Sequence, residues 1–493
     1  MTEEKTAAPR ATENRSTTPL SQTFTDYISS RWADRVDAPV VAREQSTYAA
    51  ARRASLSALH TGQRLIIPAG PAKVRSNDTD YAYRPHSAFS HLTGWASDTV
   101  PDSVLVLEPN GAGHEATLYF RKPAGRDSSE FYANPEIGEF WIGPRPSLAD
   151  VAVDLSLATA DLSELAAILE STDAATLVIR DADRDLTDRI DGRRLLAAES
   201  DTIDADDDGD ILLARNASEL RLVKDAYEID QMRKAVAATK KGFDDVIADR
   251  PAIIAHERGE RLVEGTFNRR ARAEGNAVGY DTIAASGAHA CILHWTRNDG
   301  AVTPGDLILM DAGIELDSLY TADITRTLPV SGVFTETQRL VYEAVREAAD
   351  AAFAIVRPGI RFREIHATAM QVIARKTAEW GFLPVSAEES IQPDNQHHRR
   401  YMVHGTSHHL GIDVHDCAQA RRDLYLNGIL EPGMVFTIEP GLYLQPDDLT
   451  VPEVFRGIGV RIEDNILVTE SGAENLSIGI PRTADDVEAW LAG

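Results

Sequence analysis

Acidic residues inside strongly apolar segments restrict the folds open to this chain more than any other sequence feature. In DLILMDAG, the apolar residues from Leu307 to Met310 predict a strand buried on both faces, and Asp311 stands at its end. Glu439 ends the apolar run in VFTIEPGLY, and Glu463 lies within GVRIEDNILVT. A buried carboxylate is costly unless it is paired or binds a metal. Three separate strands therefore carry an acid that needs a partner.

A fourth acid, Asp323, follows Asp311 by twelve residues, after a segment that can turn back as a hairpin. Either Asp alone is accounted for as well by the capping of a turn. Strand alternation places Arg461, Glu463 and Asn465 on one face, where Arg461 and Glu463 could form a plain surface ion pair. If the four acids had only structural roles, a turn cap or a surface ion pair would have to be assumed separately for each. A single shared site accounts for all four acids at once.

Histidines are concentrated in the segment VHGTSHHLGIDVHD. His404, His408, His409 and His415 fall within twelve residues, although the whole chain has only 14 His. With extended spacing, His404 and His408 would share a face. A lone His is usually a satisfied core or surface residue, but a cluster this dense beside strand-end acids indicates a metal or proton-transfer site.

Charge balance supports a site with two metal ions. The four acids together carry four negative charges, which two divalent cations would neutralise, and Arg461 lies on the face of Glu463. Ligation that is rich in oxygen and includes a single His favours Mn²⁺, with Co²⁺, Zn²⁺ or Fe²⁺ as alternatives. A thiolate zinc site is disfavoured.

Composition restricts the class of protein. A chain of 493 residues suggests two or three domains, and the net charge of −27 argues against nucleic acid as a partner. No apolar stretch reaches the eighteen residues of a membrane helix, and the first twenty residues lack the apolar core of a secretory signal. With only two cysteines, Cys291 and Cys417, we expect a cytoplasmic protein without disulfides and without a membrane partner.

The hydrophobic pattern and the change to an acidic segment predict two structured domains. A helical pattern begins near Ser46 and is followed by β-rich runs at 64–67, 104–107 and 116–120, which indicates an α/β domain. The acidic segment after Leu196 predicts a linker, and a charged helix is expected from Lys224 onward. The predicted division is a partly disordered extension over 1–40, an α/β domain over 41–217 and a catalytic domain over 218–493.

The second half alternates long helices with apolar strands. Thr335 and Gln338 form a capping box ahead of a helix that ends at Pro358-Gly359, and a second helix is expected from about Arg363 to Trp380. Strands are expected at the three acid-bearing segments DLILMDAG, GMVFTIEPGLYL and GVRIEDNILVT.

Taken jointly, these motifs resemble the prolidase-like metallopeptidases, and most closely their aminopeptidase P (Xaa-Pro aminopeptidase) group. The matching segments are DAG…TADITRT, HGTSHHLGIDVHD, FTIEPGLY, GVRIEDNILV and SGAHACILHWT around His294. The resemblance covers residues 216 to 483 well and extends more weakly to DYAYRPHSAFSHLTGW in the N-terminal half.

The resemblance implies an α+β fold, with a "pita-bread" catalytic domain preceded by a smaller α/β domain, and two Mn²⁺ ions. In addition to binding metal, Glu439 would exchange a proton with the attacking water, and Asp311 would anchor the substrate amine. Asp323 and Glu463 would bridge the metals. The implied metal ligands are Asp311, Asp323, His408, Glu439 and Glu463. The substrate would be contacted by His294, His404 and His415. The metal ligands would be supported by Arg461 and Tyr443 and, as a weaker candidate, by Tyr280.

The sequence departs from this pattern in two places. The two Asp ligands are twelve residues apart, where many relatives have eleven, and Ala88 stands where an Asp is frequent. The sequence leaves open whether either change alters specificity.

The implied activity is removal of an N-terminal residue that precedes proline, by a homo-oligomer (dimer or tetramer) acting on peptides. The nearest alternative is a prolidase, which cleaves only Xaa-Pro dipeptides. A methionine aminopeptidase fits less well because the N-terminal domain is large. A creatinase-like enzyme fits less well because all five metal ligands are present. A non-catalytic pita-bread binding module is a more distant alternative, since such modules lose ligands.

The thiols provide a first prediction. Cys291 lies three residues before His294, and Cys417 lies two residues after His415, but we expect both to be small buried fillers. Changing both to Ala should leave turnover within about tenfold of the wild type. A loss of several orders of magnitude at unchanged metal content would show that a thiol takes part in the reaction.

Overall fold

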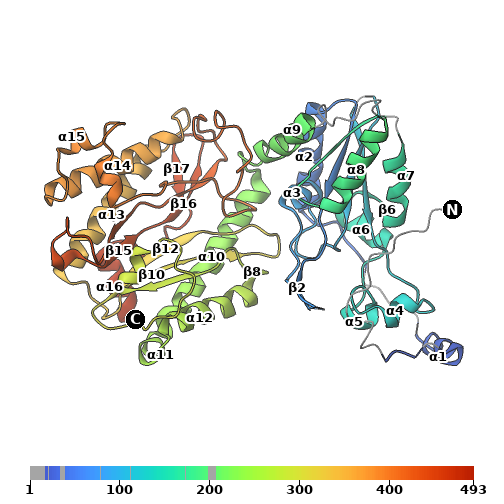
Figure 1. The fold of residues 1–493 in the computed structure, drawn as a ribbon, viewed down its shortest axis with the longest axis horizontal. Coiled ribbons are helices and arrows are strands. Elements are labelled where there is room, and N and C mark those ends of the chain that lie inside the picture. The colour runs from blue at the N-terminus through green and yellow to red at the C-terminus, as the bar shows by residue number, and fades with distance from the viewer. Residues whose placement is uncertain are drawn as a thin grey trace. The chain divides into compact units, whose positions relative to one another are not determined.

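The computed structural model describes residues 17–19, 21–33, 39–77, 79–111, 113–171, 174–197 and 207–493. The chain divides into two compact units, residues 1–217 and 218–493 (Figure 1). Across the described parts of the chain, no helix has both the length and the apolar character needed to cross a membrane.

The first unit is built on a mixed five-stranded sheet in the order β6-β5-β4-β1-β7. β1 pairs antiparallel with β4 and parallel with β7, and β5 pairs parallel with β6. The strands of the sheet are β1 Gln63–Pro68, β4 Val104–Pro109, β5 His114–Phe120, β6 Ala158–Asp161 and β7 Ala175–Val178; β2 Val74–Ser76 and β3 Thr79–Asp80 form a separate hairpin. This arrangement confirms the three predicted strands and the α/β character of the unit.

Helices connect and cover these strands. The helix predicted from near Ser46 is α2, and Ala88 is buried in α3. Residues 1–16, 20 and 34–38 of the extension predicted to be partly disordered lie outside the described residues, and α1 falls within its described part. The helices are α1 Gln22–Ile28, α2 Gln45–Leu59, α3 Ser87–Thr93, α4 Ser129–Ala133, α5 Glu139–Ile142, α6 Leu148–Leu155, α7 Leu165–Glu170, α8 Arg184–Ala197 and α9 Asp207–Glu219.

The prediction of a linker after Leu196 is wrong from Asp207 onward, where α9 begins, whereas residues 198–206 lie outside the described residues. Leu213 and Ala217, one helical turn apart, are buried and give α9 an apolar face. The carboxylate of Asp210 accepts hydrogen bonds from Arg194 and from the backbone of β7. An acidic stretch therefore forms a packed helix because its buried acid is neutralised.

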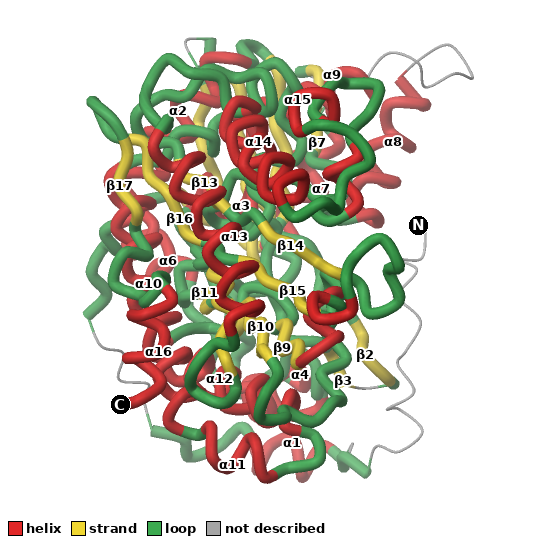
Figure 2. Tube along the Cα trace, turned by 90° about the vertical axis from the view of Figure 1, so that its left-hand side faces the viewer, coloured by secondary structure: helices red, strands yellow, loops and turns green. Residues whose placement is uncertain are grey.

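The second unit mixes helices and strands, as the α+β prediction requires. Helices α10 with α12, and α13 with α14, lie to either side of strands β10, β12 and β15 in Figure 1, and α13 crosses in front of the strands in Figure 2. The helices are α10 Ala226–Ala248, α11 Arg250–Ala255, α12 Gly259–Glu274, α13 Glu336–Ala354, α14 Arg363–Glu379, α15 Ala387–Ser390 and α16 Ala484–Ala492.

The predicted capping box is present, because the Thr335 hydroxyl accepts from Gln338 N and the Gln338 side chain accepts from Thr335 N at the start of α13. The predicted helices from Lys224 and from Arg363 are α10 and α14. The strands are β8 Ala277–Val278, β9 Ile283–Ser286, β10 Leu307–Ala312, β11 Ile314–Glu315, β12 Ile324–Pro329, β13 Val435–Ile438, β14 Gly441–Leu444, β15 Ile458–Arg461, β16 Asp464–Val468 and β17 Ala473–Asn475.

Two of the predicted strands are interrupted at their acids. β13 pairs antiparallel with β16, and β14 with β15, in one continuous register. In the gap between the two ladders, Pro440 has no N–H to donate, and the N–H groups of Glu439 and Glu463 bond instead to the carbonyls of Thr406 and Thr325. The continuous register sets Glu439 directly opposite Glu463.

A buried ion pair fixes strand β16, which begins directly after Glu463. Arg326 of β12, which is fully buried, donates to Asp464 Oδ1 at 2.7 Å and to the Glu463 carbonyl at 2.6 Å. Arg482 approaches the other Asp464 oxygen at 3.0 Å.

The Asp464→Asn substitution should lower the free energy of unfolding by about 3 kcal/mol, because removing one charge leaves Arg326 buried without its counterion. Thermal or urea unfolding of the full chain measures the loss. Asp485→Asn is the matched control, since Asp485 is exposed in its pair with Arg339 and should lose less than about 1 kcal/mol. Equal losses for both variants would contradict the assignment.

Candidate metal centre

The first two acids meet through the β10–β12 hairpin that the sequence predicted. Asp311 pairs with Thr325, so Asp323 is its diagonal neighbour on the same face of the ladder. The Tyr280 hydroxyl lies 2.6 Å from Asp311 Oδ1 and 2.5 Å from Asp323 Oδ1. One hydroxyl proton lies between two acids, and these acids are held close together.

The other two acids face each other across the interrupted ladder. Like charges placed directly opposite in a sheet are destabilising. Thr325 Oγ1 donates to Glu463 Oε2 at 2.7 Å, whereas Glu463 Oε1 is buried and has no hydrogen-bond partner among the described residues. A buried carboxylate oxygen without a donor is the environment that a cation satisfies.

His408 presents one nitrogen to these acids. Its Nδ1 lies 3.1 Å from the carbonyl of His409, which only a protonated nitrogen can bond. Its Nε2 lies 3.3 Å from Asp323 Oδ2 and 3.4 Å from Glu439 Oε1. The loop is fixed to β13 because His408 N bonds to Thr437 Oγ1 and Thr437 N bonds to the His408 carbonyl. This arrangement aims Nε2 at the acids and is typical of a metal-binding histidine.

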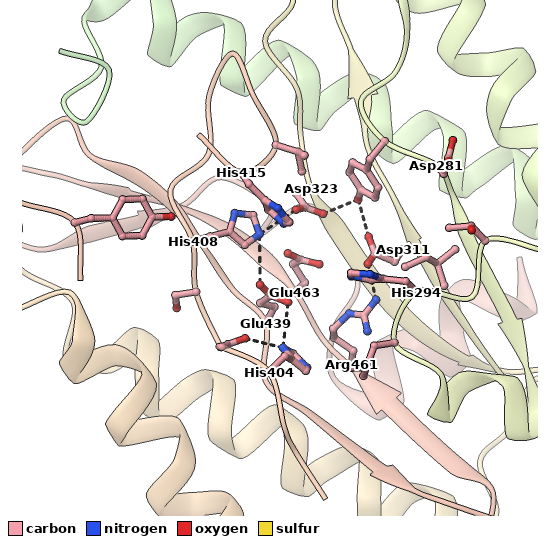
Figure 3. A pocket seen from close by; sticks show the side chains of 18 residues that line it. Asp281, His294, Asp311, Asp323, His404, His408, His415, Glu439, Arg461 and Glu463 are labelled. Carbon is pink, nitrogen blue, oxygen red and sulfur yellow. Dashed lines mark hydrogen bonds and ion pairs between the residues drawn. The ribbon is translucent and has the colours of Figure 1, made fainter. Parts of the chain in front are cut away.

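All five predicted ligands line one cavity of 710 Å³, together with His294, His404, His415 and Arg461 (Figure 3). Asp323, His408 and Glu463 each offer a ligand atom, and these atoms lie within 4.8 Å of one another. Residues that are far apart in the sequence therefore converge on a single point.

The electrostatics of the cluster show why it needs a cation. Burial raises the pKa of Glu463 well above its ordinary value, and the neighbouring acids raise it further. Burial also raises the pKa of Glu439 to about 7, against the lowering effect of His408. In Asp323, burial is outweighed by the hydrogen bond from His408, and the pKa is lowered. The acids do not all ionise together without added positive charge, so the donor set fits divalent metal.

A chain of hydrogen bonds supports the cluster from one side. Arg461 donates to Asp311 Oδ2 at 2.5 Å, to Tyr443 at 3.1 Å and to Thr325 Oγ1 at 3.1 Å. Tyr443 in turn lies 2.7 Å from His404 Nε2. Burial, with Arg461 nearby, lowers the pKa of His404 to about 3. His404 is therefore a neutral ring, 3.7 Å from Glu439 Oε2.

His294 and His415 reach the cavity from separate loops. The His415 ring lies 4.4 Å from that of His408, centre to centre. His294 is exposed, and in Figure 3 its imidazole points into the cavity.

A buried ion cluster holds the histidine loop in place. Asp416, next to His415, accepts from Arg221 Nε at 2.8 Å and from Lys224 Nζ at 3.0 Å. Burial would raise the pKa of Asp416, but Lys224 and Arg221 lower it far below its usual range. The loop is thus tied to the start of the second unit by two cations.

Sequence reasoning missed several residues of the site. Asn465 holds Asp323 through its backbone, because its side chain accepts from Asp323 N at 3.2 Å and donates to the Asp323 carbonyl. Its place on the strand face of Glu463 was the available signal. Asp281 and Tyr425, which also line the cavity, carried no signal in the sequence pattern.

Both cysteines are buried and unpaired, as predicted. Burial raises the pKa of each thiol, Cys291 and Cys417, to about 12, which makes them poor nucleophiles.

Comparison with known families places this site in context. The family described as "Metallopeptidase family M24" matches residues 230–470, and the family "Aminopeptidase P, N-terminal domain" matches residues 48–185. Xaa-Pro aminopeptidase 2 of Streptomyces coelicolor is 48% identical over 475 residues, which cover 96% of this chain and 97% of the relative. Xaa-Pro aminopeptidase of Escherichia coli is 34% identical over 89% of this chain and 96% of its own.

Solved structures give the same picture. Aminopeptidase P from E. coli in its low-pH form superposes with a TM-score of 0.77 at 30% identity, covering 92% of this chain and 99% of its own. The Pseudomonas aeruginosa aminopeptidase PepP superposes with a TM-score of 0.76 at 32% identity, covering 91% and 98%. The fold is therefore the pita-bread domain with a preceding α/β domain that the sequence predicted.

Metal binding tests the ligand assignment. His408→Ala should lose metal affinity by a large factor, because it removes the nitrogen aimed at the acids. His415→Ala is the matched control, since it removes a neighbouring imidazole and should retain the metal. Elemental analysis and calorimetric titration with Mn²⁺ measure both variants. An empty site in His415→Ala beside a full site in His408→Ala would contradict the assignment.

Proposed function

The chain belongs to metallopeptidase family M24, and we propose that it is a metal-dependent Xaa-Pro aminopeptidase that hydrolyses the bond between an N-terminal residue and a following proline. One observation carries this proposal. The complete set of predicted ligands converges in one cavity, in a chain whose N-terminal unit also matches the aminopeptidase P domain.

We infer that the site holds two divalent cations and that Mn²⁺ is the native metal. Asp311, Asp323, His408, Glu439 and Glu463 would hold the ions. Four carboxylates balance two cations, and a donor set with one imidazole and no thiolate favours Mn²⁺. When bound, the metals would polarise the scissile carbonyl and acidify the attacking water.

Glu439 is the general base and acid of the proposed reaction. It lies between His404 and His408, with Oε2 3.7 Å from His404 Nδ1 and Oε1 3.4 Å from His408 Nε2. From this position it takes a proton from the attacking water and returns it to the leaving proline nitrogen. Protonation of that nitrogen is required because an amide anion is a poor leaving group, whereas the protonated nitrogen leaves as a neutral amine.

The remaining polar groups bind and orient the substrate. Asp311, held by Arg461, anchors the free amine and thereby makes the enzyme an exopeptidase. His294, His404 and His415 line the same cavity and stabilise the tetrahedral intermediate. Tyr443 keeps His404 oriented by bonding to Nε2.

The cavity favours longer peptides over dipeptides. Among the described residues that line it, Arg461 is the only Arg or Lys. Arg461 is already bonded to Asp311, Tyr443 and Thr325, so it does not grip the terminal carboxylate of an Xaa-Pro dipeptide. A prolidase needs such a cation.

We further propose that the chain works in the cytoplasm as a homo-oligomer, a dimer or tetramer. Its two cysteines are free thiols, which suits a reducing compartment. The consecutive residues Phe140, Trp141 and Ile142 are 60%, 56% and 57% exposed, and such a run of apolar side chains suits an interface between copies.

A substrate panel on Mn²⁺-loaded protein tests the function. Xaa-Pro-Yaa tripeptides and longer peptides should be cleaved at the first bond, and Xaa-Pro dipeptides more slowly. Peptides with a blocked amine or with Ala in place of proline should be poor substrates, because they lack the anchored group or the ring.

Chromatographic detection of the released residue measures each reaction. The control is the same protein after chelation, which should be inactive until Mn²⁺ is restored. Cleavage of dipeptides alone would favour the prolidase alternative, and full activity in metal-free protein would overturn the proposed mechanism.

A further inference from the structure

The placement of His294 depends on backbone that is fixed elsewhere. Its imidazole makes no hydrogen bond with any residue that the structure describes, and the residue is exposed. Ile292, two residues earlier, is also 46% exposed. A side chain without bonds of its own takes its position from its neighbours along the chain, and the next residue, Trp295, is buried.

Glu260 of α12 accepts hydrogen bonds from four groups of the segment that carries His294. Oε1 accepts from Ser286 N and His289 Nδ1, both at 2.8 Å. Oε2 accepts from Trp295 Nε1 at 2.9 Å and from Gly300 N at 2.7 Å. The four donors span the whole segment from the end of β9 to the residue where it returns to α12. One fully buried carboxylate therefore defines the path of the loop that carries His294.

The surroundings of Glu260 leave little room for another arrangement. A Cβ added at Gly300 would lie 2.8 Å from Glu260 Oε2 and 2.8 Å from the His289 ring. The His289 and Trp295 rings stack with their centres 3.9 Å apart. All four partners present N–H groups, so both oxygens must accept. The amide of a glutamine would place its own N–H₂ against two of these donors.

Trp295 links this carboxylate to the cavity. Its indole packs in a small apolar cluster with Ile283, Cys291 and Tyr443. Tyr443 also bonds to His404, so the same cluster contacts a second histidine that lines the cavity. The indole N–H bond to Glu260 sets the rotation of Trp295, and the backbone of Trp295 sets the direction of His294.

We propose that Glu260 is a positioning residue for the reaction, which acts through Trp295 to hold His294 against the substrate. The proposal rests on the proposed function of His294 as a substrate contact. Glu260 itself touches neither the substrate nor the metal ligands.

A double-mutant cycle tests the coupling. Glu260→Gln and His294→Ala should each lower kcat/KM for an Xaa-Pro-Yaa tripeptide about a hundredfold, at unchanged metal content. The double variant should be no slower than His294→Ala, because Glu260 has no target once His294 is removed. Multiplied losses in the double variant would overturn the proposal, since Glu260 would then act by another route.

Two further variants distinguish a specific effect of Glu260 from a general loss of folding. Trp295→Phe keeps the ring but removes its bond to Glu260, and it should lower kcat/KM only in the presence of His294. Glu264→Gln is the matched control on the same helix, because Glu264 accepts one bond from Asn298 and should leave kcat/KM within about threefold. A loss in Glu264→Gln as large as in Glu260→Gln would show a general effect of α12 and would contradict a specific role.

Calorimetric binding of the product dipeptide Pro-Leu repeats the cycle without turnover. Weaker binding in Glu260→Gln that vanishes in the His294→Ala background supports the positioning role. Equal weakening in both backgrounds overturns it. Failure of the wild type to cleave Xaa-Pro peptides would overturn the proposed function, and the binding cycle would still decide the role of Glu260.

Discussion

The mutual repulsion of four buried carboxylates is the constraint on which the rest of the catalytic unit depends. Two come from a continuous hairpin and two face each other across an interrupted one, so the backbone itself forces them together. Tyr280, Thr325 and Arg461 satisfy some of their oxygens, and a buried oxygen of Glu463 remains without a donor among the described residues. Divalent cations complete what the protein leaves unsatisfied, and binding of metal therefore stabilises the fold as well as enabling the chemistry.

The antiparallel ladder of β13 and β14 with β16 and β15 is interrupted at two of the candidate metal ligands, Glu439 and Glu463. Pro440 lies between the β13–β16 and β14–β15 ladders and has no N–H to donate. The N–H groups of Glu439 and Glu463 bond instead to the chain segments that carry His408 and Asp323. The backbone bonds that a regular sheet would use internally instead join the histidine loop and β12 to the acids. Departure from regular structure at this one position therefore links the segments that carry His408 and Asp323 to the two Glu residues.

Charges outside the metal cluster follow a different rule. Asp416 is neutralised by Arg221 and Lys224, and Asp464 by Arg326, so each of these buried acids has its cation within the chain. Glu260 has N–H donors in place of a strong cation. These three acids are satisfied by the protein and fix loops and strands. The acids at the cavity are instead left short of positive charge, which separates structural carboxylates from those that are candidates to hold metal.

The sequence alone indicated a metal site and the cap of α13, because apolar strands that end in acids, together with a dense histidine segment, are compatible with few sites except a metal centre. The five-ligand set and the fold class came from the resemblance of these motifs to the prolidase-like metallopeptidases. The sequence did not reveal that residues 207–219 form a helix, since the partners of Asp210 lie 16 to 32 residues earlier, in β7, in α8 and at Arg180 between them. Nor did it reveal Glu260, whose residue type is common on helix surfaces and whose four partners meet only after folding. Tertiary structure decided these points, because hydrogen bonds between distant segments depend on how strands pair and not on local composition.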